Sequence, residues 1–325
     1  MSPNPLPSHF LHIANAGSGA SGSVSFCVPI SHVQSLANPS TLTPSSPDLA
    51  SLRRSLVAVK VSSNHWSIEN EHTALQEIKN STSPCKETLR ALFPAVKSVG
   101  NFTPAGQGLR HAYIELEAVS PAVTLGDLVH FYGDAKNNAP AIPTPLVYHF
   151  FLSIGAAVLF LRDEVGWVQD DMQPENILVR MWPGAPFGLP QFVLVDFGNA
   201  KRVVENGAEV VSSDCLDVMG LVRMLVRMAQ WETGERCEAF KKIAFDDERV
   251  RIREDREDRK LADERFRGWW ERGGRVAEEG RKEVTAGEVE GIREVFEKVA
   301  EEKGRVRDED FIRAAGWYAR TGGGV

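Results

Sequence analysis

The order of five short segments constrains this chain more than any other feature of its sequence. Each segment carries glycine, lysine, acidic or amide residues, and in chain order they are Gly17–Val24, Val57-Ala-Val-Lys60, Glu71, Asp171–Asn176 and Asp196-Phe-Gly198. A glycine loop lets backbone N–H groups approach an anion, a lysine can hold that anion, and carboxylate and amide oxygens suit a divalent cation. Together the segments predict one site that handles phosphate groups and magnesium.

The composition is that of an ordinary globular protein. The chain has 325 residues, 42% hydrophobic and 25% charged, so it can bury one large core or two modest ones. Its net charge of -7 argues against a nucleic-acid partner, because such proteins neutralise phosphates with an excess of lysine and arginine. The cysteines lie far apart, which is typical of a reducing compartment, at positions 27, 85, 215 and 237.

The sequence further predicts an intracellular protein, cytoplasmic or nuclear, with no membrane partner. Its first residues combine neither a basic segment nor an apolar one, so we expect no signal peptide. The most apolar stretch, residues 146–161, contains His149 and Ser153 and falls short of the ~20 apolar residues that cross a bilayer. We interpret this stretch as a buried core helix.

The apolar patterns and the chain length predict an α+β protein with two lobes. After a short extension at residues 1–9, we place a small β-rich N-terminal lobe at 10–117 and a mainly helical C-terminal lobe at 118–320. Residues 34–51 are rich in serine, proline and threonine, so we expect them to form a loop insertion that need not pack.

Periodicity places the elements within these lobes. In the first lobe we expect a strand–turn–strand unit within 11–30, strands at 56–61, 93–99 and 111–117, and a helix at 66–78. In the second we expect helices at 125–132, from 146 onward, at 216–231 and around 292–299, and short strands at 176–180 and 191–196.

The glycine loop carries Gly17, Gly19 and Gly22 in a GxGxxG pattern. The pattern by itself is weak, since most such matches are only glycine-rich turns. It is also found in dinucleotide-binding proteins, but there a helix follows the loop directly. Here residues 23–28 have the composition of a strand, which favours a phosphate-covering hairpin.

Lys60 ends a strand that we expect to be buried, and a buried ammonium group needs a partner of opposite charge. The following helix offers Glu69, Glu71 and Glu77. We select Glu71, because Leu75 follows it one helical turn later and gives that side of the helix an inward-facing seam.

In this order and spacing, the segments resemble those of the protein-kinase-like superfamily, and most closely its divergent, short members such as the fungal-type protein kinases. Asp171 and Asn176 have the spacing of the kinase catalytic loop, and Asp196-Phe-Gly198 follows at the expected distance. The resemblance covers roughly residues 10–235 and implies a two-lobed protein-kinase-like fold with ATP between the lobes.

The resemblance also implies a role for each residue of the phosphate and metal machinery. Lys60, paired with Glu71, would hold the α- and β-phosphates of ATP. Asp171 would accept the proton of the attacking hydroxyl group, and Asn176 and Asp196 would ligate Mg²⁺.

For the adenine ring, the resemblance implies contacts in the first lobe. The backbone from Glu117 to Val119 would bind the base, with Leu116 as the gatekeeper, and Val24 and Ala58 would pack on the ring. In the second lobe, Asp217 matches the helix aspartate that braces the catalytic loop.

The chain departs from the kinase pattern in three places. Gln169-Asp170-Asp171 stands where kinases carry His-Arg-Asp, so the arginine that reads a phosphate on the activation loop is absent. Gln173 replaces a lysine that would offset charge on the transferred phosphoryl group. No Ala-Pro-Glu lies between Asp196 and Asp217, so the usual peptide-docking platform is missing.

The resemblance therefore implies an ATP- and Mg²⁺-dependent phosphotransferase, with an atypical protein kinase acting on a Ser or Thr hydroxyl as the first reading. The missing Ala-Pro-Glu and Gln173 keep open a small-molecule kinase of the aminoglycoside type, with Asp170 as a candidate for an acidic acceptor pocket. The lost His-Arg pair keeps open a pseudokinase that acts as a scaffold.

Overall fold

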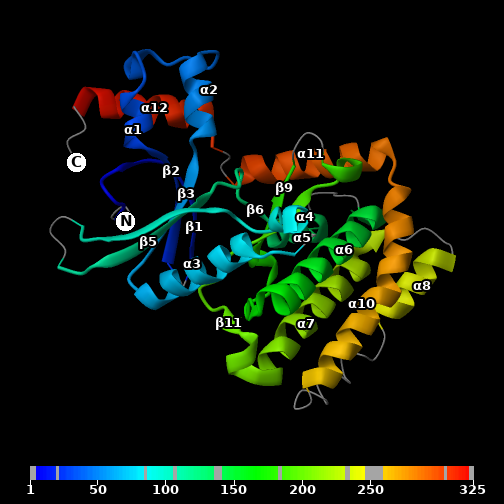
Figure 1. Ribbon diagram of the computed structural model, residues 1–325. Helices are drawn as coiled ribbons and strands as arrows, with labels where there is room; N and C mark the ends of the chain where they lie inside the picture. Colours follow the sequence, from blue (N-terminus) through cyan, green and yellow to red (C-terminus); the bar gives the residue numbers. More distant parts are fainter. Residues whose placement is uncertain are drawn as a thin grey trace. The chain divides into compact units, whose positions relative to one another are not determined.

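The computed structural model describes residues 5–19, 22–83, 86–104, 108–134, 141–181, 185–230, 235–245, 259–303 and 306–321. It is α+β, as expected, with a β-sheet region and a helical part (Figure 1). The chain divides into two compact units. The sheet unit comprises residues 1–76, 94–122 and 304–325, and the helical unit comprises residues 77–93 and 123–303.

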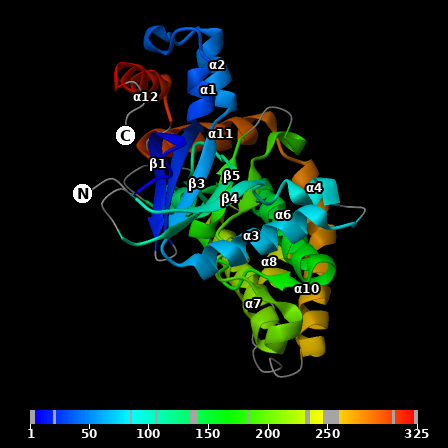
Figure 2. The same ribbon diagram turned by 60° about the vertical axis from the view of Figure 1, so that its left-hand side comes forward.

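The sheet unit is built on five antiparallel strands in the order β1-β2-β3-β5-β4. Figure 2 labels β1, β3, β5 and β4 of this sheet. Their bounds are Phe10–Gly19 for β1, Gly22–Pro29 for β2, Val57–Ser62 for β3, Val96–Phe102 for β4 and His111–Glu117 for β5. Successive side chains of a strand point to opposite faces, and in β5 the buried ones are Ala112, Ile114 and Leu116. The strands thus match the predicted ones to within a few residues.

Helix α3, His65–Asn80, follows β3 as the sequence predicts. Ile68, Leu75 and Ile78 are buried, which confirms the predicted inward face of this helix. The division between the units falls inside α3, after Gln76, so its last turn is counted with the helical unit.

The insertion at residues 34–51 is not an unpacked loop, and the prediction was wrong on this point. It begins at the last residue of helix α1, Ile30–Gln34, contains a short 3-10 turn, Pro39–Thr41, and ends within helix α2, Pro47–Arg54. Leu42, Leu49 and Leu52 are buried together in one hydrophobic cluster. The backbone N–H of Leu49 donates to Ser46 Oγ over 3.2 Å, so Ser46 caps α2.

The C-terminal helix α12, Asp308–Thr321, belongs to the sheet unit and not to the helical lobe in which we expected it. Its buried residues Phe311 and Ala315 join the cluster of Leu49 and Leu52, and Figure 1 shows α12 beside α1 and α2. The reason is complementarity, since the apolar stripe of α12 covers the leucines of the insertion. An ion pair between Arg53 and Asp308 lies at this contact.

The helical unit contains short strands between longer helices. In chain order its elements are α4 (Lys86–Arg90), β6 (Val123–Thr124), α5 (Leu125–Gly133), β7 (Ile142–Pro143), α6 (Thr144–Phe160), β8 (Trp167–Val168), β9 (Ile177–Arg180), β10 (Gln191–Leu194), β11 (Lys201–Arg202), α7 (Val203–Met228), β12 (Ala229–Gln230), α8 (Glu235–Ala244), α10 (Arg259–Lys282) and α11 (Ala286–Glu302). A π-helical turn, Leu161–Val165, prolongs α6. Two 3-10 turns lie at Pro174–Asn176 and Pro186–Gly188.

Helix α6 is the core of this unit, and α7 and α10 pack along it (Figure 1). With its π-helical turn it runs from Thr144 to Val165, 22 residues, and is long and apolar enough to cross a membrane. However, 78% of its most apolar window is buried inside the protein, which is consistent with the core helix of a soluble protein. The helix is longer than the apolar stretch at 146–161, and it is buried as predicted.

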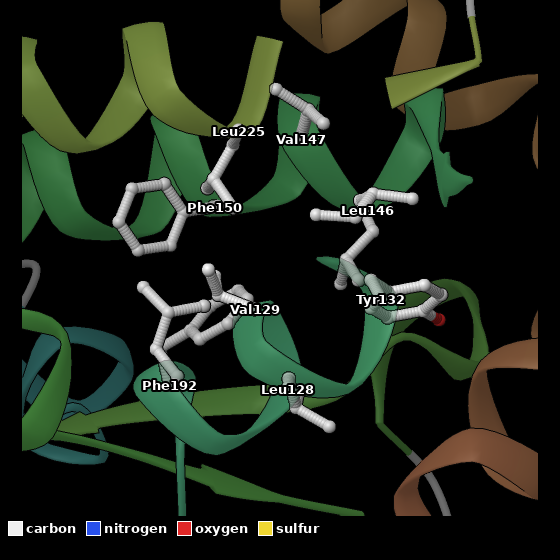
Figure 3. A pocket seen from close by; sticks show the side chains of 10 residues that line it. Leu128, Val129, Tyr132, Leu146, Val147, Phe150, Phe192 and Leu225 are labelled. Atoms are coloured by element: carbon white, nitrogen blue, oxygen red, sulfur yellow. The ribbon is translucent and has the colours of Figure 1, made fainter. Parts of the chain in front are cut away.

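A small apolar cavity of about 10 Å³ lies among α5, α6, α7 and β10. Figure 3 shows side chains that line it, among them Leu128, Phe150, Phe192 and Leu225. Pockets that bind small molecules are typically ~300–1,000 Å³. This cavity is therefore a gap in core packing.

Candidate functional site

Lys60 and Glu71 form a buried ion pair in the sheet unit. Lys60 Nζ lies 2.7 Å from Glu71 Oε2, and the two residues are only 4% and 1% exposed. Strand β3 places Lys60 opposite Val24 of β2, and α3 supplies Glu71. The structure thus makes the pair that the sequence predicts. A pair held so far from water is fixed in position, because either charge left alone would be strongly unfavourable.

The glycine hairpin joins β1 to β2, with Gly17 opposite Val24 and Gly19 opposite Gly22. Gly22 has φ 136, and a Cβ atom there would overlap the carbonyl oxygen of Val61, so the fold itself requires glycine at this position. A Cβ atom on Gly17 or Gly19 would meet nothing within 4 Å. Packing does not explain these two glycines, and they leave the backbone open to an approaching group. Ala20 and Ser21 lie outside the described residues.

Val24, Ala58, Leu116 and Glu117, which are predicted to lie at the adenine ring, occupy neighbouring strands of the same sheet, and Val119 lies just after the end of β5. Ala58 of β3 pairs with Leu116 of β5, and both Leu116 and Val119 are buried. The Glu117 N–H donates to the carbonyl oxygen of Ala95 over 2.8 Å. That N–H group is engaged in the sheet unit, so a base would have to use other backbone groups of residues 117–119.

In the helical unit, Asn176 fixes the loop that carries Asp171. Its Nδ2 donates to the carbonyl oxygen and to Oδ2 of Asp171, both over 2.9 Å. The 3-10 turn Pro174–Asn176 folds the amide back over the loop. Gln173 Nε2 lies 3.4 Å from Asp171 Oδ2, at the position where the resemblance implies a lysine.

The hairpin of β9 and β10 brings Asp196 to the same loop. Ile177 pairs with Leu194, and the Val195 N–H donates to the carbonyl oxygen of Asn176 over 3.0 Å. Burial raises the pKa of Asp171, and the nearby negative charge of Asp196 raises it further. The predicted residues Asp171, Asn176 and Asp196 therefore converge.

Phe197 anchors the segment that holds Asp196. Its side chain is fully buried and lies against Phe93, with ring centroids 5.9 Å apart. Asp196 itself has φ 61, a left-handed conformation that a buried neighbour can hold in place. Its Oδ1 accepts the N–H of Gly198 over 3.4 Å.

Gln169 ties the two loops together, a role that the sequence did not suggest. Its side chain is buried, and its Nε2 donates to the carbonyl oxygens of Val195 and Asp196 over 3.0 and 3.2 Å. A buried glutamine gives no periodic or compositional signal. Only the departure from the kinase pattern at this position could have drawn attention to it.

Asp214 braces the loop that carries Asp171, a role that the resemblance implied for Asp217. Its carboxylate accepts the N–H groups of Gln169 and Asp170 over 2.8 and 2.9 Å from within α7. Burial raises the pKa of Asp214 to about 7, although the two N–H donors act in the opposite direction. The two aspartates are three residues apart on one helix, so they share a face and the sequence could not separate them.

The oxygen atoms of Asn176 and Asp196 suit a hard cation. Among the described residues, no three His, Cys, Asp or Glu side chains form a metal cage. Mg²⁺ does not need one, since it keeps several waters and is usually held by one or two carboxylates together with substrate phosphates. This donor set therefore fits Mg²⁺ better than zinc.

No protein-family model matches the chain, and none of the curated proteins is significantly similar to it. The function must accordingly be inferred from the residues and their arrangement.

Proposed function

We propose that this protein is an ATP- and Mg²⁺-dependent phosphotransferase with a two-lobed protein-kinase-like fold. The observation that carries the proposal is the convergence of Asp171, Asn176 and Asp196 in one loop cluster of the helical unit. A magnesium ion held there would neutralise charge on the β- and γ-phosphates. The buried pair of Lys60 and Glu71 is independent support, because a fixed, buried ammonium group suits phosphate binding.

Each residue has a defined task in this proposal. Lys60, held by Glu71, binds the α- and β-phosphates, and Asn176 and Asp196 are the protein ligands of Mg²⁺. Asp171 orients the acceptor hydroxyl and accepts its proton as the hydroxyl oxygen attacks the γ-phosphorus. The bond from that phosphorus to the bridging oxygen breaks, and ADP leaves with the electron pair.

The acceptor is either a Ser or Thr hydroxyl of a protein or the hydroxyl of a small molecule. Strand β11 ends at Arg202 and helix α7 begins at Val203, so little extended chain follows Asp196. The short segment between Asp196 and α7 favours the small-molecule acceptor as a second candidate, because a platform for docking a peptide needs an extended segment.

An intracellular location, cytoplasmic or nuclear, belongs to the same proposal. Three cysteines in the described part of the chain are free, namely Cys27, Cys215 and Cys237, and the apolar helix α6 is buried. Cys85 lies outside the described residues. Free thiols and a source of ATP are both typical of intracellular compartments.

A thermal-shift experiment with ATP, with and without Mg²⁺, tests the proposal without knowledge of the acceptor. Ligand at 100 times its Kd stabilises the folded state by ~2.7 kcal/mol, a shift of several degrees. We expect a magnesium-dependent shift in the wild type that is lost in Asp196→Asn. Asp48→Asn, in helix α2, is the control and should shift as the wild type does.

The outcomes separate the candidates. No shift in the wild type would reject the nucleotide site and leave a scaffold as the function. An equal shift with and without Mg²⁺ would reject the roles of Asn176 and Asp196 as metal ligands.

A further inference from the structure

The segment after Asp196 is fastened along the start of the catalytic loop. Strand β11 pairs antiparallel with β8, so that Lys201 lies opposite Val168 and Arg202 opposite Trp167. The Val203 N–H donates to the carbonyl oxygen of Gly166 over 3.0 Å. Backbone hydrogen bonds thus hold residues 201–203 against residues 166–168.

Asp170, next to Asp171, is fixed from two sides. Its carboxylate forms an ion pair with Lys201, and its N–H donates to Asp214 over 2.9 Å. It also has φ 58, a left-handed conformation that persists only where the surroundings hold it. The ion pair therefore acts on the residue that sets the direction of the chain into Asp171.

A second ion pair lies beside the first. Arg202 pairs with Glu77, and its guanidinium lies over the Trp167 ring, 4.6 Å from the centroid. Trp167 Nε1 in turn donates to the other carboxylate oxygen of Glu77 over 2.9 Å. Glu77, which the sequence offered as one of three possible partners of Lys60, instead joins β8 to β11. Three mutually contacting side chains share the ordering entropy that an isolated surface pair bears alone.

The polarity of this arrangement is opposite to the one that the kinase resemblance implies. In typical protein kinases, the catalytic loop carries an arginine that binds a phosphate added to the following segment. Here the loop carries an anion, Asp170, and the following segment carries the cations, Lys201 and Arg202. A phosphate added to this segment would compete with Asp170 and Glu77 for the same cations.

We propose that the ion pairs Asp170–Lys201 and Glu77–Arg202 hold the catalytic loop in its working arrangement, so that this site needs no phosphorylation to become ordered. This inference rests on the proposed function, because the working arrangement is the one in which Asp171 can take part in phosphate transfer. Lys201 acts through Asp170, and Arg202 acts through Glu77 and Trp167, so both are positioning residues in it.

Amide hydrogen exchange of peptides covering residues 166–171 and 195–203 tests the inference without ATP. Lys201→Met and Asp170→Asn should each speed exchange about two- to five-fold, which corresponds to the strength of a partly exposed pair. The double variant should exchange no faster than either single variant, because the two substitutions break one interaction. Lys201→Arg should restore slow exchange, and Lys242→Met, an exposed lysine of α8, should have no effect.

Salt and phosphate supply the decisive comparisons. Exchange in the wild type should rise toward that of Lys201→Met in 1 M salt, because high salt weakens partly exposed ion pairs. Phosphatase treatment, verified by intact mass, should change neither the exchange nor any magnesium-dependent ATP shift. Additive effects of the two substitutions, or a loop loosened by phosphatase, would overturn the inference.

The two proposals fail separately. If the Lys201 and Asp170 variants speed amide exchange but ATP with Mg²⁺ does not raise the melting temperature of the wild type, only the proposed function is refuted. A clear ATP shift with exchange that is indifferent to Lys201 would refute only the inference about the ion pairs.

Discussion

At the scale of single residues, buried polar groups with specific partners set the local geometry within each unit. Lys60 is held by Glu71 in the sheet unit, and Asp214 holds the N–H groups of Gln169 and Asp170 in the helical unit. Such groups are stable inside a protein only when their partners are present. Their positions are consequently fixed before any ligand binds.

The Lys60–Glu71 pair tests whether a buried charge in this protein depends on its partner. Glu71→Leu leaves a buried ammonium group without its carboxylate and should lower the free energy of unfolding by ~3–5 kcal/mol. The double variant Lys60→Met/Glu71→Leu replaces both charges with apolar groups and should be more stable than Glu71→Leu. Urea unfolding of the two variants measures the difference. A double variant less stable than the single one would contradict a buried, paired role.

At the scale of elements, close helix contacts in the helical unit depend on glycine. In α10, a Cβ atom on Gly280 would overlap the ring of Tyr148 from α6. Tyr148 cannot easily turn away, because it is buried and packs edge-on against Phe240 with ring centroids 4.8 Å apart. Small residues at such contacts set the spacing of α6 and α10.

Substituting these glycines separates packing from helix propensity. Gly280→Ala should destabilise the protein by ~1–3 kcal/mol, since overpacking exceeds the gain in propensity. Gly291→Ala, in α11, is the matched control, because its Cβ atom would meet nothing within 4 Å. It should stabilise the protein by up to ~1 kcal/mol. Thermal unfolding of both variants measures the two effects, and the same sign for both would refute the packing account.

The elements also show what a local pattern can predict. Strands β3 and β5 and the inward face of α3 follow from apolar runs and helical spacing in the sequence, and the structure confirms them. Helix α2 was missed, although Ser46-Pro47-Asp48 is a helix-start signal and Leu49 and Leu52 share one face. The high content of serine and proline in this segment outweighed that signal.

At the scale of the whole molecule, the sheet unit is assembled from three separate stretches of the chain, and the last includes α12. The apolar stripe of α12 predicts that the helix packs, but it does not say on which surface. That partner is set by tertiary complementarity, so the sequence could not place residues 308–320 in the sheet unit.

The same limit applies to the candidate site. Lys60 with Glu71, and Asp171 with Asn176, were predictable because their spacing along the chain carries the information. The sequence could not predict the contacts of Gln169 and Asp214 or the Asp170–Lys201 pair. These contacts join residues between 26 and 45 positions apart, and Gln169 in addition gives no periodic signal. Long-range polar contacts emerge only from the folded chain.

The measurement that tests the central claim most directly is ATP turnover by the wild type and by Asp171→Asn, each with Mg²⁺. Release of the γ-phosphate to water needs no identified acceptor. We predict that Asp171→Asn keeps the magnesium-dependent thermal shift while turnover falls ~10²–10⁴-fold, because the base is lost and the metal ligands remain. A wild type that binds Mg²⁺ and ATP without turnover, or a variant that turns over as fast as the wild type, would contradict the assignment of this protein as a phosphotransferase.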